Sequence, residues 1–298
     1  MSITKLDELV KIAANGGKRK IVVAAAEDDH VLHAIDEARK ANVVEPIFVG
    51  HTEKINEIAK REKVDISGIK IVDEPNPAVA AKRAVEFCAS GEAQVLMKGL
   101  VSTADFLRAV LNKEVGLRTN DLLCHIGIFE LPAYHKLLGL TDAAQNIEPT
   151  FEEKVKIITS SVKCFNKLGV AKPKIAIIAP VESVNPKMES TVHAAMLTQM
   201  NRRGQIKNCI IDGPLAFDNA VSKEACEHKG IVSEVGGDAD LIVSHNIEVG
   251  NPIYKAFNYF AGGTIAGMIM GAKVPIVLTS RADSNRSKFM SIALAATY

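Results

Sequence analysis

Short runs of apolar residues alternate with longer amphipathic stretches in the N-terminal third of the chain. Apolar and β-branched side chains run almost continuously over residues 21–26, 46–50, 69–72 and 95–98. Between these runs apolar positions recur every three or four residues, as in residues 28–41. Continuous apolar strands joined by helices are typical of a parallel sheet covered on both faces. The pattern therefore predicts a doubly wound α/β fold.

This alternation breaks between Asp121 and Ala144, where two strand-like runs follow one another without a helix between them. Such a pair indicates a hairpin or a sheet edge, and we place a domain boundary there. The alternation then resumes to the C-terminus. We expect strands over 174–179, 209–212, 240–243 and 275–278, and helices over 150–168, 187–203, 219–228, 252–260 and 283–297.

Composition narrows the class of protein. The 298 residues are 47% hydrophobic, and 36 basic against 35 acidic residues leave a net charge of +1. No global field would attract nucleic acid or an anionic membrane. The five cysteines are scattered without a C-x-x-C pair, which fits a reducing cytosol. The charged N-terminus and the lack of a long apolar run predict a cytoplasmic protein without a membrane span.

Several nucleotide and metal motifs are missing. The turn after the first strand lacks the glycines of a dinucleotide site, and no stretch matches the phosphate-binding loop of nucleoside triphosphatases. His30 and His33 are one helical turn apart but have no third ligand nearby in the sequence. We therefore expect no metal and no tightly bound cofactor.

Polar residues at strand ends are the candidates for chemistry, because ligands of open α/β sheets gather there. Lys98 ends an apolar strand, where a cation is costly unless it meets an anion. Ser102 and Asp105 have the spacing of a capping box, which explains them structurally, and Arg108 could reach the same region.

Three further strand ends carry asparagine or aspartate. Asp142 and Asn146 flank a turn before a long helix. Asn185 and Asn251 each precede a proline. Asparagine as N-cap with proline after it would leave free N–H groups at a helix start, which is a ready anion site.

The last strand ends in Ser280, Arg281 and, two residues later, Asp283. A hydroxyl, a guanidinium and a helix N-terminus that converge would suit a phosphate or a developing oxyanion. A structural alternative is that Ser280 caps the helix and Asp283 completes a capping box.

Six segments together resemble the phosphate acyltransferases, the family of phosphotransacetylases and phosphotransbutyrylases. In chain order they are MKGLVSTADFLRAVL, LTDAAQNIEPTFEEK, VNPKM, DGPLAFDNAVS, ADLIVSHNIEVGNPIYKAF and PIVLTSRADS. The segments DGPLAFDNAVS and VNPKM resemble the butyryl branch more than the acetyl branch. The resemblance implies the reaction acyl-CoA + phosphate ⇌ acyl phosphate + CoA, with CoA as a substrate.

The resemblance also implies a fold similar to isocitrate and isopropylmalate dehydrogenases, with an active-site cleft between two α/β domains. Carried over, residues 1–121 with 268–298 form one domain and residues 122–267 the other. Family members assemble as homodimers or larger homo-oligomers, so we expect the same here.

The resemblance also implies roles for individual residues at matching positions. Ser280 and Arg281 match the Ser-Arg pair of the family's active site, and Arg108 matches an arginine near CoA and phosphate that follows the segment starting at Thr103. The acetyl branch has an aspartate six residues past the Ser-Arg arginine, where this chain has Ser287. Asp283 is the nearest substitute for that general base.

Three alternatives remain open at this point. One is a preference for acetyl over butyryl groups, because the lining of the acyl pocket is not identified. Another is a CoA-binding protein without activity, which the serine at position 287 motivates. A metal- and NAD-dependent hydroxy-acid dehydrogenase on the same fold is disfavoured by the lack of clustered aspartates.

Overall fold

The computed structural model of the chain describes residues 3–279 and 283–298. Its contacts divide the chain into two compact units. The first unit comprises Asp7–Leu123 and Ala266–Tyr298, and the second comprises the chain up to Leu6 together with Cys124–Ile265. The domain bounds expected from the family resemblance, residues 1–121 with 268–298 and residues 122–267, stay a prediction.

The first unit is a six-stranded sheet with helices on both faces. Its elements are α1 (Asp7–Asn15), β1 (Arg19–Ala24), α2 (Asp29–Lys40), β2 (Val44–Gly50), α3 (Thr52–Glu62), β3 (Lys70–Asp73), α4 (Pro77–Ala89), β4 (Val95–Lys98), α5 (Thr103–Val110), β10 (Thr264–Met270), β11 (Ile276–Val277) and α11 (Asn285–Thr297).

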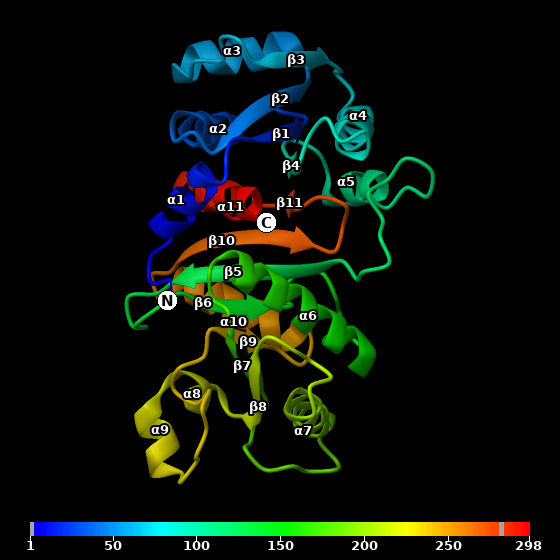
Figure 1. Cartoon of the computed structure of the whole chain (residues 1–298). Coiled ribbons are helices and arrows are strands. Elements are labelled where there is room, and N and C mark those ends of the chain that lie inside the picture. Colours follow the sequence, from blue (N-terminus) through cyan, green and yellow to red (C-terminus); the bar gives the residue numbers. More distant parts are fainter. Residues whose placement is uncertain (1–2, 280–282) are drawn as a thin grey trace. The chain divides into compact units, whose positions relative to one another are not determined.

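In this unit the strand order is β3-β2-β1-β4-β11-β10. Among the described strand pairs within the unit, β10 and β11 are antiparallel and the others are parallel. Helices α1, α2 and α11 pack together on one face, and α4 and α5 pack on the other (Figure 1). Burial on both faces explains why the strands read as continuous apolar runs.

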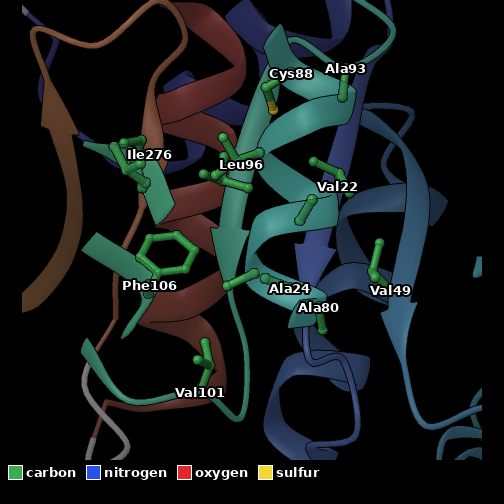
Figure 2. Packing of buried hydrophobic residues seen from close by; sticks show 14 of the residues in the cluster. Val22, Ala24, Val49, Ala80, Cys88, Ala93, Leu96, Val101, Phe106 and Ile276 are labelled. Carbon is green, nitrogen blue, oxygen red and sulfur yellow. The ribbon is translucent and has the colours of Figure 1, made fainter. Parts of the chain in front are cut away.

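The core under α4 and α5 is almost completely closed to solvent. Phe106 of α5, Leu96 of β4 and Ile276 of β11 are each 0% exposed and belong to one apolar cluster with Val22 and Ala80 (Figure 2). Small alanines on α4 let that helix approach the sheet closely. The cluster thereby fixes α5, the helix that follows the end of β4.

The turn after β4 lies directly against the end of β1. The N–H groups of Gly99 and Leu100 donate to the carbonyl oxygens of Ala24 (2.8 Å) and Ala25 (2.6 Å). A Cβ on Gly99 would lie 2.1 Å from the Ala25 oxygen, so a side chain cannot fit there. The glycine sets the path of the chain between Lys98 and Ser102.

The second unit is a five-stranded sheet, also covered on both faces. Its elements are β5 (Cys124–Glu130), β6 (Leu138–Thr141), α6 (Phe151–Lys167), β7 (Lys174–Ile178), α7 (Glu189–Arg202), β8 (Ile210–Leu215), α8 (Phe217–Val221), α9 (Lys223–His228), β9 (Leu241–Val243) and α10 (Ile247–Tyr259).

Its strand order is β5-β6-β9-β7-β8, with β5 and β6 antiparallel and the other pairs parallel. Neighbouring residues of β6 show the two faces, since side chains alternate along a strand. Leu140 belongs to a cluster with Phe257 of α10, whereas a Cβ on Gly139 would meet Phe165 of α6. In Figure 1, α7 and α8 also lie on opposite sides of this sheet.

The predicted α/β class and the strand pair without a helix between them are confirmed, the latter as β5 and β6. Helix 219–228 is wrong in detail, because Ser222 divides α8 from α9 and caps α9. Helix α1 and strand β10 are missing from the sequence expectations. The apolar stretch of β10 is interrupted by Gly267.

Truncating Phe106 tests the core that positions α5. We expect Phe106→Ala to lower the free energy of unfolding by about 3–5 kcal/mol, because a fully buried ring leaves a cavity. Urea unfolding of Phe106→Ala and of Leu111→Ala, whose side chain is 41% exposed, provides the comparison. Leu111→Ala should cost less than about 1 kcal/mol. Equal losses for the two variants would contradict this account of the core.

Candidate active-site residues

Lys98 is a buried cation at the carboxyl end of β4. The residue is 9% exposed, and its Nζ donates to the carbonyl oxygens of Gly99 (3.2 Å) and Val101 (3.0 Å). Carbonyl dipoles offset part of the cost of removing an ammonium group from water. The charge expected at this strand end is therefore present and fixed by the turn that Gly99 makes possible.

Ser102 caps α5, as expected. Its Oγ accepts from the N–H of Asp105 (3.0 Å) and donates to the Asp105 carboxylate (2.7 Å). Arg108, one turn further, pairs with the same carboxylate and has 74% of its side chain exposed. The Ser102 hydroxyl, and then Arg108, lower the pKa of Asp105. Thr103 is the first residue of α5 and is exposed, so a ligand can reach both Thr103 and Arg108.

Ser280 and Arg281 lie outside the described residues, so their predicted roles stay predictions. The alternative in which Ser280 caps the last helix with Asp283 is wrong. Helix α11 begins at Asn285, and its N-cap is Ser284, whose Oγ accepts from the N–H of Ser287 (3.1 Å). Ser284 can cap the helix because its hydroxyl reaches the third helical residue.

Ser287, at the position of the acetyl branch's aspartate, is buried in this cap. It is 4% exposed, and its Oγ accepts a hydrogen bond from the Ser284 hydroxyl (3.1 Å). The next residue, Lys288, is also buried and donates to the carbonyl oxygen of Asp283 (2.6 Å). Burial lowers the pKa of Lys288, against the opposing effect of Asp283. Lys288 thus holds the backbone of Asp283 in place before α11.

Asp142 organises the loop that follows β6. Its Oδ1 accepts from the N–H groups of Ala144 and Gln145, both at 2.9 Å, and its Oδ2 accepts from the amide of Asn146 (2.6 Å) and the N–H of His125 (3.1 Å). Four donors satisfy a carboxylate that is 3% exposed. The structure therefore brings Asp142 and Asn146 together.

His125, at the start of β5, lies under this loop. Its ring is buried, and its Nδ1 has no hydrogen-bond partner among the described residues. Burial lowers the pKa of His125, and the Asp142 carboxylate opposes that effect in part. The buried ring of His125 is therefore harder to protonate than the ring of an exposed histidine.

The expected helix starts at Asn185 and Asn251 are wrong. Helix α7 begins at Glu189, and Asn185 lies in the preceding turn, where its Oδ1 accepts from the N–H of Lys187 (3.0 Å). Helix α10 begins at Ile247 with Asn246 as its N-cap, so Asn251 and its proline lie inside the helix. The free N–H groups that would have made anion sites at these two positions are therefore not at helix starts.

Asn251 instead supports the Asp142 loop. Its Nδ2 donates to the carbonyl oxygen of Ala143 (3.0 Å). A Cβ on the preceding residue, Gly250, would lie 2.6 Å from the backbone carbonyl oxygen of Asp142. Helix α10 therefore approaches the loop more closely than an alanine would allow. Asn251 is thus brought together with Asp142 and Asn146, for a reason other than the one predicted.

Sequence reasoning missed a cluster at the carboxyl ends of β6, β7 and β9. Lys154, 3% exposed in the first turns of α6, places its Nζ 3.0 Å from the Nδ1 atoms of both His193 and His245. Glu189 lies 3.4 Å from the Nε2 of His245. Burial lowers the pKa of Lys154 and of both histidines. The four-residue spacing of Glu189 and His193 on one helix was a signal for this cluster.

The exposed guanidinium of Arg108 can attract and position an anion at α5. Nucleophilic cysteine chemistry does not fit, because all five thiols are buried and burial raises the pKa of Cys88 and Cys164 to about 12. In the described part of the chain, no helix is both long enough and apolar enough to cross a bilayer.

The chain belongs to the phosphate acetyl/butaryl transferase family, whose model matches residues 5–87 and 76–296. It is 46% identical over 294 residues to a phosphate butyryltransferase of Clostridium acetobutylicum, covering 99% of this chain and 98% of the relative. It is 43% identical to a phosphate acetyltransferase of Thermotoga maritima, covering 98% and 99%. The resemblance drawn from six motifs is thereby confirmed.

Solved structures agree with the family and the fold. A branched-chain phosphotransacylase from Enterococcus faecalis superposes with a TM-score of 0.82 at 34% identity, covering 94% of this chain and 98% of that one. A 4-hydroxythreonine-4-phosphate dehydrogenase from Klebsiella pneumoniae, 11% identical, shares the fold at a TM-score of 0.54. The expected likeness to a dehydrogenase fold is therefore confirmed at the level of the fold alone.

The lowered pKa of His125 predicts how the free energy of unfolding depends on pH. The unfolded chain takes up a proton near the ordinary histidine pKa of 6.5, whereas the folded state resists it. The contribution of His125 to the free energy of unfolding is therefore present above pH 6.5 and is lost as the pH falls below 6.5. The slope cannot exceed about 1.4 kcal/mol per pH unit for one group.

Urea unfolding of wild type and His125→Gln between about pH 5 and pH 8 measures this slope. The variant should lose part of the decline in stability below pH 6.5. His228→Gln, at an exposed position at the end of α9, is the control and should keep the decline. An unchanged slope in His125→Gln would show that another group causes the acid sensitivity.

Proposed function

We propose that this chain is a phosphate acyltransferase that transfers a butyryl or branched short-chain acyl group between CoA and inorganic phosphate. The observation that carries the proposal is the 46% identity to a phosphate butyryltransferase over almost the whole of both chains. The likeness to a branched-chain phosphotransacylase supports the same acyl class.

The reaction needs positioning and charge stabilisation. A phosphate oxygen attacks the thioester carbonyl, the C–S bond breaks, and the CoA thiolate leaves and takes up a proton. Phosphate is already an anionic nucleophile, so bringing it into line and stabilising the oxyanion contribute most in this direction. In the reverse direction the CoA thiol must lose its proton, because the thiolate is the nucleophile.

The first unit supplies the cations of the proposed mechanism. Arg281 and Arg108 bind phosphate, and Ser280 donates to the carbonyl oxygen or the leaving sulfur. Lys98, Ser102 and Thr103 form the strand end that receives the anionic substrates. The exposed guanidinium of Arg108 and the fixed ammonium of Lys98 support these roles.

The proton acceptor for the CoA thiol is Asp283 in this proposal. Ser287 is buried in the helix cap and hydrogen-bonded to Ser284, so its hydroxyl is occupied where a carboxylate would serve as base. Lys288 fixes the backbone of Asp283 one residue before that cap. This arrangement favours Asp283 as the residue that replaces the missing aspartate.

The second unit supplies the Asp142 loop. Because its carboxylate already accepts four hydrogen bonds, Asp142 serves the substrate by holding the loop in shape. Asn146 and Asn251 support the same loop. For Asn185, whose amide closes a turn, the family resemblance is the remaining support for a role in substrate binding.

A cytoplasmic enzyme that works as a homodimer or larger homo-oligomer is part of this proposal. The near-zero net charge and the buried thiols are compatible with a reducing cytosol. The family resemblance supports the assembly of identical chains.

An acetyl preference is the second candidate, favoured by the 43% identity to a phosphate acetyltransferase. Initial rates with acetyl-, butyryl- and isobutyryl-CoA and phosphate separate the two. We expect kcat/KM for butyryl- or isobutyryl-CoA to exceed that for acetyl-CoA by at least about tenfold, since each methylene in a matched pocket contributes about 1 kcal/mol or more. A clear acetyl preference would refute the butyryl assignment. Binding of CoA without turnover of any acyl phosphate would refute catalysis itself.

Replacing Arg281 tests the proposed phosphate site. We expect Arg281→Ala to lower kcat/KM by about 10²–10³-fold, as the loss of one charge-stabilising donor does in other active sites. The matched control is Arg286→Ala, which removes the same charge five residues later, where Arg286 pairs with Asp7 at the surface. The control should retain activity. If both variants keep wild-type turnover, Arg281 has no catalytic role.

A further inference from the structure

Three side chains in the second unit offer metal-binding atoms within a small space. Glu189 and His193 are one turn apart on α7, and His245 lies two residues after the end of β9. One ligand atom from each lies within 4.8 Å of the other two. The sequence did not reveal the set, because His245 is far from the other two along the chain.

The chemistry of this set suits a divalent transition metal. Imidazole nitrogen and carboxylate oxygen bind zinc at about 2.0–2.2 Å, so ligand atoms around one ion lie roughly 3.3 Å apart. The His245 Nε2 and the Glu189 carboxylate are already 3.4 Å apart. The side chain of Glu189 is 64% exposed and can adjust, and water can reach the remaining coordination positions from that side.

Lys154 controls whether the imidazole nitrogens are available. An ammonium group only donates, so the Nδ1 atoms 3.0 Å from its Nζ accept and each neutral ring carries its proton on Nε2. A metal would have to take a nitrogen lone pair from each ring, either by displacing the ammonium at Nδ1 or by shifting the ring proton off Nε2. The positive charge of Lys154 also repels a dication.

We propose that Glu189, His193 and His245 form a binding site for one divalent transition-metal ion of the zinc class, and that Lys154 weakens the affinity of this site. The site is separate from the acyl-transfer chemistry proposed above and does not depend on it. It revises the expectation of no metal that the sequence alone supported.

Titration of the purified full-length protein with Zn²⁺ tests the proposal, with binding followed by calorimetry and by competition with a chromophoric chelator. The wild type should bind one Zn²⁺ per chain at this site. Lys154→Met should bind it about 10–100-fold more tightly, because the competing ammonium is gone and the apolar stem remains. Glu189→Gln and His193→Gln should each weaken binding by about tenfold or more.

Glu152→Gln is the matched control for Glu189→Gln. Glu152 is an exposed carboxylate whose charge also acts on His193, though less strongly than that of Glu189, so its replacement removes a nearby negative charge without removing a ligand. The control should keep the affinity of the wild type within about threefold.

Cobalt absorption provides a second measurement, since Co²⁺ bound to imidazole and carboxylate in place of Zn²⁺ gives visible bands that report its ligands. Equal Zn²⁺ affinity of wild type and Glu189→Gln would overturn the site. Equal losses of Zn²⁺ affinity in Glu189→Gln and Glu152→Gln would show that Glu189 acts only through its charge and is not a ligand. Because Glu189 is exposed, this comparison stands even if Lys154→Met does not fold.

Discussion

Parallel pairing of the strands determines where polar chemistry can occur in each unit. Strands β1, β2, β3, β4 and β11 run in one direction, so the turns that leave their carboxyl ends emerge at a common edge. Both faces of the sheet are covered, which leaves the edges as the places where charged side chains can meet ligands. Lys98, the cap of α5 and the segment before α11 follow such strand ends, and the Asp142 loop follows β6 in the other unit.

The same constraint explains why the fold could be predicted from the sequence. A strand buried on both faces must be apolar at consecutive positions, and that signal survives without any knowledge of its neighbours. Strand β4 was predicted with its observed bounds, 95–98. Helix α6, expected over 150–168, is observed as Phe151–Lys167, and Thr150 and Glu153 form a complete capping box at its start. The signal from the hydrophobic pattern was weaker for β10, whose stretch contains a glycine.

Candidate site residues were harder to predict, because helix starts depend on competing local hydrogen bonds. Asparagine before proline is a good start signal, yet Asn246 and Ser284 cap their helices through side chains that reach three residues ahead. Because α10 begins at Ile247, Asn251 lies inside the helix and not at its start, where it had been expected. The packing of α10 against the Asp142 loop, which gave Asn251 a different partner, is a tertiary contact that no local pattern encodes.

Lys154 makes a tertiary contact that links separate elements and that no sequence motif predicts. Its ammonium joins the starts of α6 and α7 to the connection after β9, through two imidazoles that come from separate elements. A buried ammonium is stable there because neutral nitrogen acceptors face it, with Glu189 and Glu148 favouring its charge. A metal ion bound by the same rings would join two of these three connections through stronger bonds. The lysine therefore links these three connections, and the two histidines that accept from it are also residues that would bind a metal.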